Sequence, residues 1–172
     1  GSQTRQGAAS TFLSDVLRRV SAAFGKDYDA AVAGSLMLSC DNAHAIHPNH
    51  PEYADKNHRV RMNGGEVIKY NANRNYATDA WSAALFRVIC TQAGVPVQLY
   101  ANRADMPGGS TLGNIANTQV SLPTVDIGAA QLAMHSAYET AGAADTAYLY
   151  RAIKQAFETT LTAVSDGAAE FV

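Results

Sequence analysis

The sequence is poor in the features that mark secreted, membrane-spanning and nucleic-acid-binding proteins. It holds two cysteines in 172 residues, which is too few for the disulfide framework of a small secreted domain. Its first ten residues hold no apolar segment of the signal-peptide kind, and no apolar run approaches the roughly 20 residues of a membrane span. A formal net charge of −2 provides no basic field for nucleic acid or an anionic membrane.

The two cysteines and the length suggest where and how the chain folds. Cys40 and Cys90 each lie in an apolar run, so we expect both thiols to be buried, in a reducing and therefore cytoplasmic compartment. A hydrophobic content of 47% and a charged content of 16% are ordinary for a globular protein. We therefore expect residues 1–172 to form a single domain with its own core.

Hydrophobic periodicity predicts that helices alternate with strands. Apolar residues at helical spacing predict helices over 10–24, 78–94 and 145–164. Ser10 is the expected cap of the first helix, and the second is expected to begin at Thr78 or Asp79 and to end at Gly94. Short apolar runs predict strands at 34–40, 64–71, 95–101 and 120–128. This order favours an α/β sandwich on a mixed or parallel sheet, with functional loops at the carboxyl ends of strands.

One stretch, SCDNAHAIHPNH at 39–50, gathers an aspartate and three histidines, and residues 41–63 lack periodicity and are therefore predicted to form a long loop. Asp41 follows a predicted strand, where a carboxylate either holds a metal ion or caps a turn; local sequence favours the cap. His44 and His47 are three residues apart, so both side chains could point the same way. They lack the intervening Glu of the HExxH zinc motif. His50 and His58 are interpreted as solvated loop histidines.

Four further features remain ambiguous when each is taken alone. His135 follows an apolar run, where a histidine is more often structural than a ligand. The loop PGGSTLGN lacks the lysine of a phosphate loop, so it is either a flexible turn or a set of N–H groups for a substrate carbonyl or carboxylate. Lys69 interrupts an apolar strand, where it either snorkels outward or carries a charge into a cleft. Tyr76, near a helix start, is by default a core or rim aromatic.

Taken together and in order, four motifs resemble the aspartyl aminopeptidase family of dizinc exopeptidases. The motifs are SCDNAHAIHPNH, GGEVIKYNANRNYATDA, NRADMPGGSTLGNIANTQVSLPTVDIG and QLAMHSAYETAG. The wording DMPGGSTLGN is more similar to the bacterial branch, because the eukaryotic branch usually has Cys at position 108 and Pro at position 114. The resemblance implies a three-layer α/β/α sandwich of the zinc-exopeptidase type.

The resemblance also implies a chemistry and a set of roles. Family members remove one residue from the free N-terminus of a peptide, using two zinc ions bridged by an aspartate and a water, with a glutamate as general base. By this resemblance Asp41 ligates one zinc ion and His135 the other, while His44, Lys69 and Tyr76 contact substrate. His47 matches a histidine thought to reach an adjoining active site, which implies a homo-oligomer.

Several elements that the family requires are missing from these 172 residues. The sequence has no His-x-Asp and no Glu-Glu pair, and the 40 residues before Asp41 contain neither His nor Glu. We therefore expect a C-terminal portion of the catalytic domain, without the dimerisation domain, whose general base lies upstream of Gly1. Because catalytic zinc usually has about three protein ligands, the chain alone is expected to be inactive and to bind zinc weakly or not at all. The alternatives are a non-catalytic oligomerising fragment and one half of a split enzyme.

Overall fold

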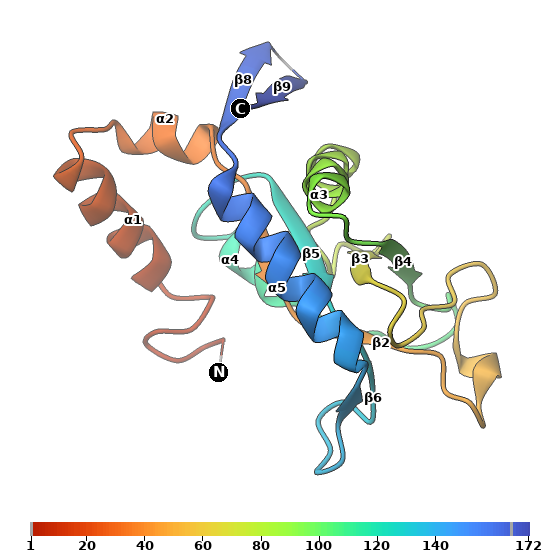
Figure 1. Ribbon diagram of the computed structural model, residues 1–172. Helices are drawn as coiled ribbons and strands as arrows, with labels where there is room; N and C mark the ends of the chain where they lie inside the picture. Colours follow the sequence, from red (N-terminus) through yellow and green to blue (C-terminus); the bar gives the residue numbers. More distant parts are fainter. Residues whose placement is uncertain (1, 166) are drawn as a thin grey trace.

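The computed structural model describes residues 2–165 and 167–172, and its first two helices stand apart from the rest of the chain (Figure 1). Helix α1 (Phe12–Ala23) contacts helix α2 (Tyr28–Ala33), and the Arg18 guanidinium lies 3.9 Å from the centre of the Tyr28 ring. The N-cap of α1 is Thr11 rather than the predicted Ser10, and the Ser10 hydroxyl accepts the Phe12 N–H at 3.2 Å from one residue further upstream.

A four-stranded mixed sheet forms the centre of the molecule. Its strand order is β1 (Met37–Cys40), β5 (Thr124–Gly128), β3 (Glu66–Tyr70) and β4 (Val97–Ala101). β1 runs parallel to β5 and β3 parallel to β4, whereas β3 and β5 are antiparallel. The four predicted strands and the mixed sheet are therefore confirmed.

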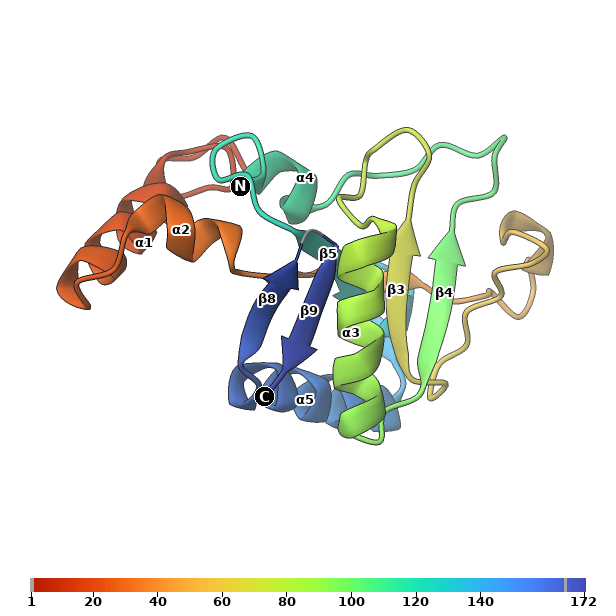
Figure 2. The same cartoon turned by 90° about the horizontal axis from the view of Figure 1, so that it is seen from above.

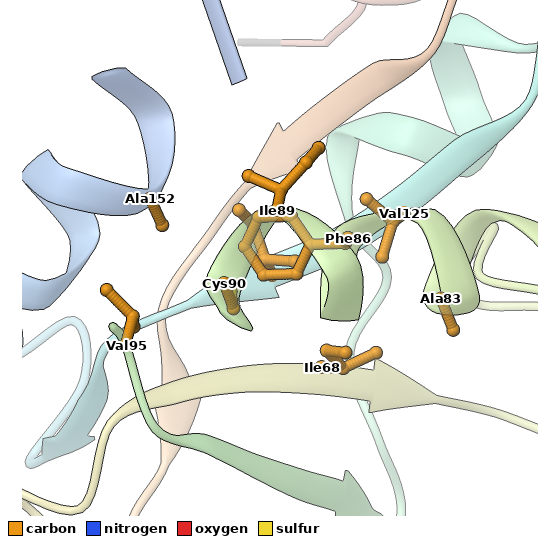
Figure 3. Packing of buried hydrophobic residues seen from close by; sticks show 9 residues of the cluster. Ile68, Ala83, Phe86, Ile89, Cys90, Val95, Val125 and Ala152 are labelled. Carbon is orange, nitrogen blue, oxygen red and sulfur yellow. The ribbon is translucent and has the colours of Figure 1, made fainter. Parts of the chain in front are cut away.

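Two helices, α3 (Ala80–Gln92) and α5 (Ala143–Glu158), cover one face of this sheet and contact each other (Figure 2). The core between these helices and the sheet contains nine buried side chains (Figure 3): Ile68, Ala83, Phe86, Ile89, Cys90, Val95, Val125, Ile127 and Ala152. Burial of these apolar groups is the main term that holds the helices on the sheet.

The ends of α3 follow from its sequence. The Asp79 carboxylate accepts the Ser82 N–H at 2.7 Å, and the Ser82 hydroxyl accepts the Asp79 N–H at 3.1 Å, which together form a capping box. Gly94 has a φ of +63°, the left-handed conformation that ends many helices and favours glycine. Of the two predicted starts, Thr78 and Asp79, the structure has Asp79, and the predicted end at Gly94 is confirmed.

The opposite face of the sheet carries a short helix and a second, smaller sheet. Helix α4 (Leu112–Ala116) contacts β1 and β5. Its Gly113 faces Ser39 and Asp126. Because side chains alternate along a strand, these two point away from the core that α3 and α5 cover. The smaller sheet consists of β2 (Ala43–His44), β6 (Ala130–Leu132) and β7 (Thr140–Ala141). The α/β prediction is therefore confirmed, with helices on both faces of the central sheet.

The structure corrects two predictions. The last helix ends at Glu158 rather than at 164, and β8 (Leu161–Ser165) pairs antiparallel with β9 (Ala168–Phe171). The β-branched residues of the TTLT sequence after Glu158 favour extended backbone over helix. Cys90 is buried as predicted, but Cys40 is exposed, because it is the last residue of β1 at the edge of the described sheet.

The predicted long loop contains β2 and one turn of 3-10 helix, η1 (Pro51–Tyr53), but is otherwise irregular. None of the helices within 2–165 and 167–172 has the length and apolar character that a membrane crossing requires.

Candidate active site

Five of the six residues singled out for metal or substrate contact line one cavity, although they come from four separate segments of the chain. Asp41, His44, Lys69, Tyr76 and His135 all border this cavity of about 270 Å³, which we call the site cavity. The remaining lining residues are Asn42, Ala43, Tyr100, Gly109, Ser110, Thr111 and Met134. The structure thus brings together residues for which the local sequence did not decide between a structural and a functional role.

Asp41 leaves the end of β1 and is held by the neighbouring strand. Its N–H donates to the Ile127 carbonyl at 2.9 Å, which continues the β1–β5 pairing for one residue beyond β1. Its side chain is 41% exposed and borders the site cavity. No backbone N–H in the described residues bonds this carboxylate, so the turn-cap interpretation of Asp41 is not supported.

Lys69 is an almost fully buried cation on the face of β3 opposite the helices. Its side chain is 3% exposed, and its Nζ atom donates to the Asn42 carbonyl at 3.3 Å and lies 3.8 Å from Asp41 Oδ2. Burial lowers the pKa of Lys69, while the carboxylates of Asp41 and Asp126 oppose that shift. The lysine therefore carries its charge into the cleft and does not snorkel outward.

Tyr76 lies beside Lys69, and the residue that follows it is held by the buried carboxylate of Asp126. Lys69 Nζ is 5.1 Å from the centre of the Tyr76 ring, within the range of a cation–π contact. Burial raises the pKa of Tyr76, so its hydroxyl remains a proton donor near neutral pH. The fully buried Asp126 accepts the N–H of Ala77 at 2.5 Å, which fixes the chain directly after Tyr76.

The two histidines of the site cavity differ in backbone and environment. Desolvation lowers the pKa of His44, and the neighbouring positive charges of Lys69 and His135 lower it further. His135 has a φ of +67°, a left-handed conformation that is uncommon outside glycine and that concentrates at functional sites. Its N–H donates to Glu139 Oε1 at 2.5 Å, which holds this turn after β6.

The sixth predicted residue, His47, lies in an adjoining cavity. This second cavity, the histidine cavity, has a volume of about 310 Å³ and is bordered by His44, His47, His50 and His58 among others. His50 and His58 each pair with a carboxylate, those of Glu52 and Asp55, at 3.1 and 2.8 Å. His58 is half-buried rather than fully solvated, because it packs into this wall.

Three contributors to the site were missed by reasoning from local sequence. Asn42 accepts the Lys69 ammonium and also donates to Gln131 Oε1 at 2.5 Å, which ties the Asp41 turn to β6. Asp126 lies beneath Tyr76, and Tyr100 borders both cavities. The one available signal was Asp126, an acidic residue within an otherwise apolar strand.

The PGGSTLGN loop reaches the site cavity through Gly109, Ser110 and Thr111. The Thr111 N–H already donates to the Asn75 carbonyl at 3.2 Å, so it does not point a free donor at a substrate. The loop therefore borders the cavity without offering the Thr111 N–H as a free donor.

The donor set fits only part of a zinc site. A carboxylate and an imidazole, from Asp41 and His135, are both ordinary zinc ligands and border the same cavity. Within the residues that the structure describes, however, no group of three or more His, Cys, Asp or Glu side chains is placed to hold a metal ion. The chain thus offers up to two donors, fewer than the about three that a catalytic zinc usually takes.

The family to which the chain belongs accounts for this combination of fold and cavity. Residues 1–157 match the family described as Aminopeptidase I zinc metalloprotease (M18). The chain therefore belongs to the M18 family of zinc metallopeptidases, in agreement with the resemblance seen in its motifs.

Individual relatives support the same assignment. The chain is 50% identical over 160 residues to a probable M18 family aminopeptidase 2 of Mycobacterium leprae, covering 91% of this chain and 37% of the relative. It is 43% identical over 161 residues to a probable aspartyl aminopeptidase of Ricinus communis, covering 92% of this chain and 33% of the relative. The mApe1 dodecamer structure from S. cerevisiae matches with a TM-score of 0.81 and 32% identity, over 91% of this chain and 35% of that one. The chain thus spans little more than a third of the length of these relatives.

Proposed function

We propose that this chain forms one part of the active site of a zinc-dependent aminopeptidase, which removes a single residue from free peptide N-termini. The observation that carries the proposal is the convergence of Asp41, His44, Lys69, Tyr76 and His135 on one cavity. Membership of the M18 family supports the same reaction class. The 172 residues would then be a C-terminal portion of a three-layer α/β/α catalytic domain.

Each residue of the cavity has a role in this proposal. Asp41 and His135 would supply one ligand each to two zinc ions, and zinc bound there would polarise the scissile carbonyl and lower the pKa of a coordinated water. Lys69 presents its amino group, and Tyr76 its hydroxyl group, to the polar groups of the substrate. His44 contributes an imidazole whose lowered pKa favours its neutral form.

The proposal includes the expectation that these 172 residues are inactive by themselves. They contain no Glu-Glu pair to provide a general base and no His-x-Asp to complete the ligand set. The purified chain is therefore expected not to hydrolyse aminoacyl-p-nitroanilides in the presence of added zinc. Turnover well above that of buffer with zinc would overturn this expectation.

Complementation tests the site itself. The chain is mixed with a polypeptide containing the residues of the M. leprae relative that lie outside the match, and zinc-dependent hydrolysis is measured. We expect activity to appear, and to be lost when Asp41→Asn or His135→Gln is introduced into this chain. The matched control is His50→Gln, an exposed histidine outside the site cavity, which should retain activity. Activity that is equal in all three variants would contradict the assigned roles.

Self-association is a second proposal, favoured by an apolar stripe on α1. Phe12, Val16, Val20 and Phe24 recur every fourth residue and are 40% to 76% exposed. The dodecameric assembly of the S. cerevisiae relative supports a homo-oligomer, in which His47 would reach an adjoining active site. If the stripe mediates association, Val20→Asp should lower the mass measured by light scattering, whereas Ala22→Asp on another side of α1 should not. A chain that is already monomeric would contradict this second function.

We also infer a cytoplasmic location, because Cys40 and Cys90 are both free thiols in the structure.

A further inference from the structure

Tyr100 occupies the boundary between the site cavity and the histidine cavity. It belongs to β4 and is paired in register with Lys69 of β3, so both side chains project from the same face of the sheet. Its ring centre lies 6.3 Å from that of Tyr76 and 6.5 Å from that of His44. Tyr100, His44 and Gly109 are the residues that border both cavities. Tyr100 has the largest side chain of the three and therefore contributes the bulkiest group to the shared boundary.

The Tyr100 hydroxyl interacts with Tyr76 and with the loop that follows β4. The Tyr100 hydroxyl donates a hydrogen bond to Asn102 Oδ1, which draws the end of the ring toward the loop. A Cβ atom at Gly108 would lie only 1.7 Å from Asn102 Nδ2, so the Asn102 amide fills the space that a side chain at position 108 would take. Glycine at position 108 is thus a condition for the Asn102–Tyr100 hydrogen bond.

The same loop is anchored to the histidine-bearing segment. The Arg103 guanidinium pairs with the Asp105 carboxylate at 2.6 Å and donates to the Glu52 carbonyl at 2.5 Å. The wall is therefore supported on both sides: Asn102 holds the ring and Arg103 holds the loop.

We infer that Tyr100, positioned by Asn102, is a specificity-determining residue of the proposed aminopeptidase site. A peptide whose N-terminal residue lies between Asp41 and His135 must direct its side chain along the remaining walls of the site cavity. The histidine cavity adjoins it across the Tyr100 ring. A glycine in the first position fits beside the ring, whereas a large side chain requires the volume on its far side. The ring thus limits the size of the N-terminal side chain that the site accepts.

The inference rests on the proposed function, and binding of two dipeptides to this chain, mixed with zinc and the complementing M. leprae polypeptide, tests the two separately. Gly-Ala and Phe-Ala are titrated into isotope-labelled protein, and dissociation constants are taken from NMR shift changes. We expect Tyr100→Ala to raise the affinity for Phe-Ala roughly ten-fold relative to Gly-Ala, which is the scale of discrimination that a side-chain pocket provides. A smaller change in the same direction is expected for Asn102→Ala and for Tyr100→Phe, because both retain a ring but lose its hydrogen bond.

The outcomes distinguish the two proposals. Equal changes in the affinity for both dipeptides would overturn the specificity role while leaving substrate binding intact. Failure of both dipeptides to bind the complemented mixture that contains the unmodified chain would overturn both the substrate-binding proposal and the inference that depends on it.

A second measurement tests the positioning of Tyr100 without any ligand. Nitration of tyrosines by tetranitromethane, mapped by mass spectrometry, should proceed faster at Tyr100 in Gly108→Ala than in the unmodified chain, because the displaced Asn102 releases the hydroxyl. Gly109→Ala is the matched control, since no atom lies within 4 Å of a Cβ at that position. Equal nitration of Tyr100 in both variants would contradict the role of Asn102.

Discussion

The ammonium group of Lys69 lies 3.8 Å from the carboxylate of Asp41, although Lys69 is in β3 and Asp41 follows β1, and these strands are not neighbours in the sheet. β5 lies between β1 and β3, so the contact passes over the face of the sheet, where the Asp41–Asn42 turn crosses β5 near Gly128. This crossing places a proposed zinc ligand beside a buried cation. The geometry of the candidate site therefore depends on the close approach of the Asp41–Asn42 backbone to Gly128 as well as on the side chains.

A double-mutant cycle tests the Lys69–Asp41 interaction. Asp41→Asn removes the charge that partly compensates a buried ammonium, so we expect a loss of about 1 kcal/mol in the free energy of unfolding. The loss is limited to this scale because Asp41 is 41% exposed and its charge is partly screened by solvent. In a Lys69→Met background the same substitution should have little effect. Urea unfolding, followed by the fluorescence of Trp81, provides the measurement; an equal loss in both backgrounds would mean that the residues are not coupled.

The crossing over β5 predicts a strict requirement for glycine at position 128. A Cβ at Gly128 would lie 2.2 Å from the Asp41 carbonyl oxygen, and that backbone cannot move without breaking the β1–β5 pairing. We expect Gly128→Ala to lower the free energy of unfolding by about 2–3 kcal/mol. Gly109→Ala, where the added methyl group meets no neighbour, should change it by less than about 1 kcal/mol. Similar stability of the two variants would show that the Asp41 turn can relax away from β5.

The sequence predicts the parts of this site better than their arrangement. Asp79 and Gly94 were recognisable as the ends of α3 because capping depends on residues within a few positions of each other. The change from helix to strand after Glu158 was missed, because the apolar residues of 145–164 continue at helical spacing while β-branched residues and pairing with β9 favour the strand. The roles of Asn42, Asp126 and Tyr100 depend on which strands are neighbours and in which direction they run. Local periodicity contains neither piece of information.

Glu66 predicts an unusual dependence of stability on pH. It is fully buried, and neither of its carboxylate oxygens has a hydrogen-bond partner in the described residues. Burial, with a further contribution from Asp145, raises its pKa from 4.5 to about 8. Between these values the folded chain retains a proton that the unfolded chain has released. The free energy of unfolding contributed by Glu66 is therefore fully present below pH 4.5 and is lost as the pH rises to about 8.

Glu66→Gln should abolish this dependence. At pH 4 the variant and the unmodified chain are expected to unfold alike, because both carry a neutral side chain. At pH 8.5 the variant should be more stable, by an amount on the order of 3 kcal/mol. Glu158→Gln, at a side chain that is 56% exposed, is the matched control and should follow the unmodified chain at every pH. Chemical denaturation across this range would contradict the assignment if the Glu66→Gln curve ran parallel to the control.

The left-handed backbone at His135 predicts that the proposed zinc ligand reduces the stability of the fold. A non-glycine residue at a φ of +67° has its Cβ close to its own carbonyl oxygen, which costs about 1 kcal/mol or more. His135→Gly should therefore be more stable than His135→Ala by about 1 kcal/mol, although both lack the imidazole. At His47, an exposed histidine whose φ is not positive, the order should reverse, because glycine there only adds freedom to the unfolded chain. Thermal unfolding of the four variants measures both differences. If alanine were the more stable residue at both positions, the turn at His135 would not be strained, and the chain would tolerate an imidazole there at no cost to its fold.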